Sequence, residues 1–146
     1  MMGISESMEL VRATAMPGCP ARVNTGDLTI ANGHRLTRDL LQLDTPPDAI
    51  FAICDSAAFG AMQAIKSRGL CIPNDMALAG FTDEPVAALV EPALATVAQP
   101  TFAIGQIAAQ LFLAQIRGGA SYQPTTQVLK TRLVIRESSQ KKSNSR

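Results

Sequence analysis

The chain of 146 residues is 47% hydrophobic and 17% charged, which fits one soluble α/β domain with a substantial core. Its formal net charge is +1, and its one dense basic run, residues 141–146, follows the last apolar segment. This composition excludes a nucleic-acid footprint within the chain. No apolar run is long enough to span a membrane, and the first nine residues lack the basic and apolar regions of a secretion signal.

The first third of the chain predicts a helix, a strand and a second helix. Apolar residues at helical spacing over residues 4–15 predict a helix, which the breaker residues 17–20 end. Residues 21–24 predict a short strand, and leucines on one face of residues 29–43 predict the next helix. The single histidine, His34, lies near the start of that helix, where we expect it to be exposed.

The middle of the chain carries the clearest strand pattern. The continuous apolar run at residues 49–54 predicts a strand buried on both faces. A helix is expected over residues 57–68, with Asp55 or Ser56 as its N-cap. A second buried strand is predicted over residues 76–81.

Further strands and helices alternate after this point. Thr82 or Asp83 is the expected cap of a short helix near residues 86–90. A third strand is predicted over residues 94–98, and an amphipathic helix over residues 101–117.

The last regular pattern is an alternation over residues 127–137, which predicts a strand at or near a sheet edge. Strand, helix, strand and helix in short order form the βαβ rhythm, which right-handed crossovers turn into a parallel sheet. The predicted fold class is therefore α/β, a parallel sheet flanked by helices.

The loops after the strands predict where a ligand would bind, because open parallel sheets bind ligands beyond the carboxyl ends of their strands. Polar side chains and helix N-termini on that rim suit a small polar ligand, and apolar side chains offer a flat wall. The predicted rim residues are Leu28, Cys54, Asp55, Phe81, Thr82, Asp83, Gln99 and Thr101.

Two carboxylates on this rim, Asp55 and Asp83, suggest acid–base chemistry as an alternative, but helix capping explains both, so no catalytic residue is predicted. Cys19, Cys54 and Cys71 are odd in number and lack C-x-x-C spacing, which indicates reduced thiols in a cytoplasm. With one histidine and no glycine-rich nucleotide motif, the sequence predicts no metal and no cofactor.

Two segments resemble motifs of a known protein family. Residues 47–62 read PDAIFAICDSAAFGAM, and residues 69–81 read GLCIPNDMALAGF. They resemble the segments "PdAIfa.nD..A.Ga" and "Gl.vP.Disv.GfD" of the LacI/GalR family of transcription regulators. The likeness continues through residues 92–100 and 133–138, in matching order and spacing over roughly residues 26–138.

The resemblance implies a periplasmic-binding-protein-like sensor. In such a sensor two α/β subdomains hinge around a small-molecule effector, a sugar or a purine-like metabolite, within a cytoplasmic homodimeric repressor. Residues 1–138 would be the C-terminal part of the effector-binding and dimerisation domain, and residues 139–146 a flexible basic tail. Residues 101–127 would cross toward a first subdomain absent from this chain, and DNA would contact only an absent N-terminal head. Gly3 would match the glycine of the family's "R..G" motif.

The resemblance also implies roles for single positions. The family usually has Asn where Cys54 stands and Asp where Thr82 stands. The carboxylate of that Asp often holds sugar hydroxyls, a role that the neighbouring Asp83 could take. The family's effector contacts fall on Leu28, Cys54, Thr82 and Thr101, with Gln99 and Ile104 nearby. A dimer face would include Phe59, Met62, Ala87 and Val90, for which ordinary core packing is the alternative.

Two other functions remain as alternatives. A solute-binding protein of a transporter would have the same fold, although the free cysteines and the absence of a secretion signal favour the repressor. A sugar-processing enzyme would need Asp55 and Asp83 as its catalytic groups, and we expect no enzymatic activity.

Overall fold

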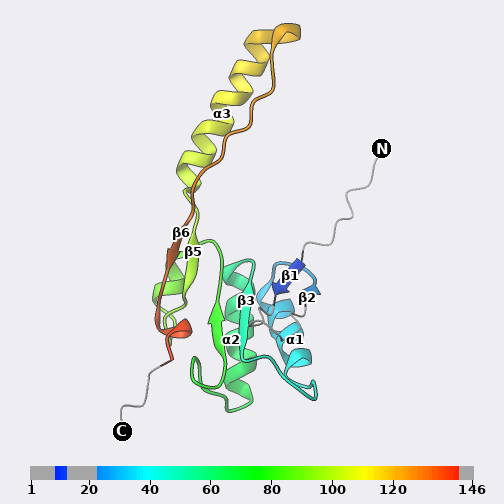
Figure 1. Ribbon diagram of the computed structural model, residues 1–146, viewed down its shortest axis with the longest axis vertical. Coiled ribbons are helices and arrows are strands. Elements are labelled where there is room, and N and C mark those ends of the chain that lie inside the picture. Colours follow the sequence, from blue (N-terminus) through cyan, green and yellow to red (C-terminus); the bar gives the residue numbers. More distant parts are fainter. Residues whose placement is uncertain (1–8, 13–22, 142–146) are drawn as a thin grey trace.

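The computed structural model describes residues 9–12 and 23–141, and it divides them between an α/β body and a long hairpin. The hairpin consists of α3 (Thr101–Gly118), the short turn η2 (Gly119–Ser121) and the segment that returns from it. Figure 1 shows this hairpin projecting away from the body. The α/β class predicted from the sequence is confirmed.

The body contains a four-stranded sheet in the order β2-β1-β3-β4. Its strands are β1 (Glu9–Arg12), β2 (Val23–Thr25), β3 (Ala49–Ala52) and β4 (Ala77–Ala79). Only β3 and β4 pair in parallel, whereas β1 is antiparallel to both of its neighbours. The sheet is therefore mixed rather than purely parallel.

The first predicted helix is wrong where the structure describes it. Residues 9–12 form β1, because pairing with β2 on one side and β3 on the other satisfies their backbone groups. The rest of that prediction, together with Gly3 and Cys19, lies outside the described residues. The strand predicted over residues 21–24 is confirmed as β2, shifted by one or two residues.

The strand predicted over residues 49–54 is confirmed as the shorter β3, but its burial differs from the expectation. Ile50 and Ala52 are buried, whereas Ala49 and Phe51 are only half-buried. One face of β3 therefore faces the core and the other is only partly covered.

Two helices pack closely against each other in the body. These are α1 (Ile30–Leu40), which the Thr29 side chain caps, and α2 (Asp55–Ser67), which packs on β3 and β4. A Cβ on Gly60 of α2 would lie 1.9 Å from the Ile30 carbonyl oxygen, so glycine is required at this contact. His34 is half-buried in α1 rather than exposed as expected.

A second, two-stranded sheet continues the body towards the hairpin. Its strands are β5 (Thr96–Ala98) and β6 (Arg132–Val134), which pair antiparallel. The sequence predicted β5 as a third parallel strand, and isolated parallel bridges such as that between Ala79 and Ala95 do link its segment to that of β4. Of the strand predicted over residues 127–137, only residues 132–134 form a strand, β6.

A serine near the end of the described chain completes the junction between β4 and β5. Ser138, in the short helix η3 (Glu137–Ser139), is fully buried. Its hydroxyl donates to the Leu78 carbonyl at 2.6 Å and accepts from the Ala95 amide at 2.8 Å. Residues 142–146 of the predicted basic tail lie outside the described residues.

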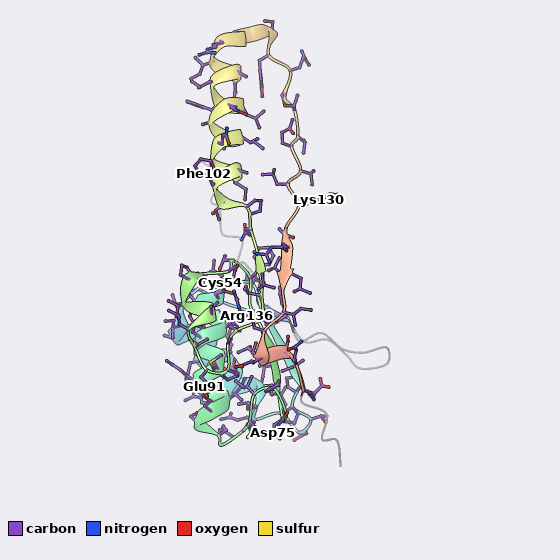
Figure 2. All side chains as sticks on the ribbon, turned by 90° about the vertical axis from the view of Figure 1, so that its left-hand side faces the viewer. Cys54, Asp75, Glu91, Phe102, Lys130 and Arg136 are labelled. Carbon is purple, nitrogen blue, oxygen red and sulfur yellow. The ribbon has the colours of Figure 1, made fainter. Side chains whose placement is uncertain are left out.

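The helix predicted over residues 101–117 is confirmed as α3, and it buries none of its side chains against the described part of the chain. Its exposed apolar side chains include Phe102, Phe112 and Ile116, and Phe102 is 86% exposed. Figure 2 shows Phe102 on the helical arm and Lys130 on the returning arm. Over residues 9–12 and 23–141, no helix is long and apolar enough to cross a membrane.

Candidate functional site

The carboxyl ends of β3, β4 and β5 lie at the end of the body from which the hairpin projects, and Figure 2 shows Cys54 near this end. Cys54 follows β3 and is 8% exposed. Its sulfur accepts a hydrogen bond from the Ala57 amide at 3.4 Å, which makes Cys54 the N-cap of α2. The expectation that Asp55 or Ser56 caps this helix is therefore wrong.

Asp55 has a different task, because its carboxylate joins two loops beneath the rim. The side chain is fully buried. Oδ1 accepts from the Thr96 hydroxyl at 2.6 Å, and Oδ2 accepts from the Glu84 amide at 2.8 Å. A Cβ on Gly80 would lie 2.2 Å from Oδ1, so only glycine leaves room for the carboxylate. The hydrogen bonds of Asp55 thus link the segment that follows β4 to strand β5.

The turn after β4 has an unusual backbone. Thr82 has φ 135° and Asp83 has φ 60°, both in the region that favours glycine. The Thr82 amide donates to the Val97 carbonyl at 3.0 Å, and the Asp83 amide donates to the Thr96 hydroxyl at 3.3 Å. Neither side chain caps the following short helix η1 (Pro85–Ala88), which begins after Glu84 without a side-chain cap. The predicted caps are therefore wrong.

Arg136 holds the second residue of this turn. Its Nη2 donates to Oδ1 of Asp83 at 2.8 Å, and its Nη1 donates to the Leu94 carbonyl at 2.8 Å. The two charged side chains are 19% and 23% exposed, so the ion pair is largely shielded from solvent. Because Asp55 and Asp83 each have protein partners of their own, the catalytic alternative gains no support from this geometry.

One polar group on the rim has no partner. The Thr82 hydroxyl is buried and accepts or donates no hydrogen bond among the described residues. Thr82 also bridges to Ala98, which places it beside the last residue of β5, immediately before Gln99. A buried hydroxyl without a partner is costly, so this one calls for an explanation.

The remaining predicted rim residues surround this point less closely. Phe81 is half-buried and packs edge-to-face on Phe51, with ring centroids 6.5 Å apart. Thr101 is exposed at the start of α3, and Leu28 is 40% exposed in the loop before α1. Gln99 and Ile104 line a hollow of about 370 Å³ between α3 and the returning segment. The structure therefore brings Asp55, Thr82 and Asp83 into one network and leaves Leu28 outside it.

Sequence reasoning missed three residues of the network, namely Gly80, Thr96 and Arg136. All three stand in segments that carry the family resemblance, which was the available signal. Nothing in the local sequence marks Thr96 as the partner of Asp55, because the two are 41 positions apart. In the described part of the chain, no group of three His, Cys, Asp or Glu side chains is placed to hold a metal ion.

The residues predicted for a dimer face divide into two kinds. Met62 and Ala87 are 5% and 0% exposed and belong to the core, which is the alternative that the sequence left open. Phe59 and Val90 are half-buried at the margin of that core. The exposed Leu89, which the sequence analysis did not single out, lies beside Val90 and is 81% exposed.

Comparison with known proteins identifies the family. Residues 8–139 match the model of the periplasmic binding protein-like domain. The regulator CelR of Thermobifida fusca is 34% identical over 130 residues, which are 89% of this chain and 38% of CelR. The lactose operon repressor of Rhizobium radiobacter is 37% identical over 113 residues, which are 77% of this chain and 98% of that sequence.

Solved structures agree with this match. A CelR–cellobiose complex has a TM-score of 0.73 at 35% identity, covering 77% of this chain and 34% of the other. A LacI family regulator of Enterococcus faecium with bound ribose has a TM-score of 0.67 at 29% identity, covering 77% and 41%. The chain thus spans well under half the length of CelR. It belongs to the periplasmic binding protein-like domain family, in the branch of the LacI-type transcriptional regulators.

Proposed function

We propose that the chain is the ligand-sensing part of a LacI-type repressor, and that effector binding at the rim controls DNA binding by a head outside this chain. The observation that carries the proposal is the Thr82 hydroxyl, which is buried without a partner at the carboxyl end of β4. It stands on a turn with two consecutive residues at positive φ. Such strained positions cost about 1–3 kcal/mol each and gather at ligand sites.

The effector we propose is a sugar or a related small polar metabolite. Two structurally similar regulators were solved with cellobiose and with ribose. On this chain the Thr82 hydroxyl, the Gln99 amide and the Thr101 hydroxyl offer uncharged hydrogen-bonding groups, and Phe81 and Leu28 offer apolar surface. The one carboxylate directly beside Thr82, that of Asp83, already pairs with Arg136. Recognition of the effector would therefore depend on these uncharged groups.

The rest of the proposal concerns the assembly. We place the protein in the cytoplasm as a homodimer without enzymatic activity. The dimer face would include Phe59 and Val90 together with the exposed Leu89. In the whole protein, ligand binding would favour one relative position of the two subdomains and so reposition the DNA-binding heads.

Calorimetric titration with ribose, cellobiose and a set of nucleosides tests the proposal. We expect at least one of these compounds to bind, and Thr82→Val to weaken that binding about tenfold, a loss of about 1.4 kcal/mol. The substitution keeps the branched shape and replaces only the hydroxyl with a methyl group.

Thr37→Val is the matched control, because the Thr37 hydroxyl is also buried without a partner among the described residues, but within α1. This control should bind as the unmodified protein does. If no compound binds, or if both valine variants bind equally well, the proposal is wrong.

A further inference from the structure

The strained turn at Thr82 and Asp83 needs something to hold it. Asp tolerates a φ of 60° better than most residues, but a β-branched threonine at 135° is a true outlier. A free chain would relax both residues out of these conformations. The contacts that oppose this relaxation therefore determine where the Thr82 hydroxyl lies.

Three contacts hold the turn, and one of them comes from far along the chain. The amides of Thr82 and Asp83 donate to Val97 and Thr96 in the β5 segment. The third is the ion pair from Arg136, 53 positions after Asp83. This ion pair restrains the turn through the side chain of Asp83 rather than through the backbone.

Arg136 is suited to this task by its fork of donors. It lies two residues after β6, and its second nitrogen is fixed on the Leu94 carbonyl just before β5. The guanidinium thus joins the turn to both segments of the two-stranded sheet. Charge-assisted hydrogen bonds of this kind, shielded from water, are stronger than neutral ones.

We infer that Arg136 is a positioning residue for the effector site, which fixes the Thr82–Asp83 turn through Asp83 without itself touching the effector. The inference rests on the proposed function for its link to an effector. The geometric part, that Arg136 holds the turn, is testable without any ligand. Loss of the ion pair should release the turn while leaving the core helices intact.

Hydrogen exchange of the 146-residue chain, read at single amides by NMR, is the decisive measurement. In Arg136→Gln we expect the amides of Thr82 and Asp83 to exchange at least tenfold faster, with amides of α2 unchanged. Arg136→Lys retains the charge but cannot reach both acceptors. The exchange rates of the same two amides in this variant should therefore fall between those of the unmodified protein and those of Arg136→Gln. Arg35→Gln is the matched control, because Arg35 pairs with Asp39 at 3.3 Å on the exposed surface of α1.

Titration with ribose and with cellobiose completes the test. If the chain binds either sugar, Arg136→Gln should weaken that binding at least tenfold and Arg35→Gln should leave it unchanged. Faster exchange at the turn without sugar binding by any variant would keep the positioning role and count against the proposed function. Unchanged exchange at Thr82 and Asp83, or equally faster exchange in α2, would overturn the positioning role.

Discussion

Asp55 offers the sharpest test of how the rim is built. Asp55→Ala removes the acceptor of the Thr96 hydroxyl and of the Glu84 amide. Each buried donor left without a partner costs about 1–3 kcal/mol. Glu84 is only half-buried, so the full sum is not expected. We therefore expect a loss of about 2–4 kcal/mol, a large share of a typical domain's stability of about 5–15 kcal/mol.

Asp55→Asn separates the charge from the hydrogen bonds. The amide oxygen can accept from Glu84, and the amide nitrogen can donate to the Thr96 oxygen after the threonine proton turns away. The charge assistance and the acceptor of the buried Thr96 proton are lost, whereas the cost of burying a charge disappears. The expected loss is about 1–2 kcal/mol, so asparagine should rank above alanine.

Equilibrium urea unfolding, followed by circular dichroism, measures both losses. Asp39→Ala is the control, because Asp39 forms an exposed ion pair with Arg35 and should cost no more than about 0.5 kcal/mol. If Asp55→Ala lowers the free energy of unfolding no more than this control does, then Asp55 does not link the two segments as described above.

Three further outcomes follow from packing. Gly60→Ala should destabilise the body by about 1–3 kcal/mol or more in urea unfolding, because its Cβ would overlap the backbone of α1, whereas Gly105→Ala on α3, with no atom within 4 Å, should not lower the urea midpoint. In a Cys19→Ser background, a thiol reagent should label the exposed Cys71 much faster than the buried Cys54, and equal rates would contradict the enclosure of Cys54. Exchange measured by mass spectrometry on the 146-residue chain should be at least tenfold slower in α2 than in α3, because α3 buries no side chain; equal protection would show that α3 is covered.

Local sequence patterns predicted the helices and strands whose ends are determined by residues close by in the sequence. The helix α1 begins one residue after the predicted start at residue 29, and α3 matches the predicted residues 101–117 to within one residue. Residues 9–12 were misjudged because their apolar side chains fit helical spacing, while pairing with β2 and β3 decides their conformation. Spacing within one segment carries no information about partners elsewhere in the chain.

The candidate site shows the same division. The rim itself could be located, because parallel strands end in loops that carry polar residues. The roles within it could not, since Asp55 fits the local pattern of a helix cap, and only the fold brings Thr96 within 2.6 Å of it. The strain at Thr82 is equally invisible in the sequence, because no glycine or asparagine marks that position.

The buried Ser138 has a consequence for how the body forms during synthesis. Its hydroxyl joins Leu78 to Ala95, which the ribosome produces 60 and 43 residues earlier. A nascent chain can form α1, α2 and β3 from neighbouring segments as they emerge. The two hydrogen bonds of Ser138 can form only after the hairpin and β6 have been synthesised, so this part of the junction between β4 and β5 is a late event in translation.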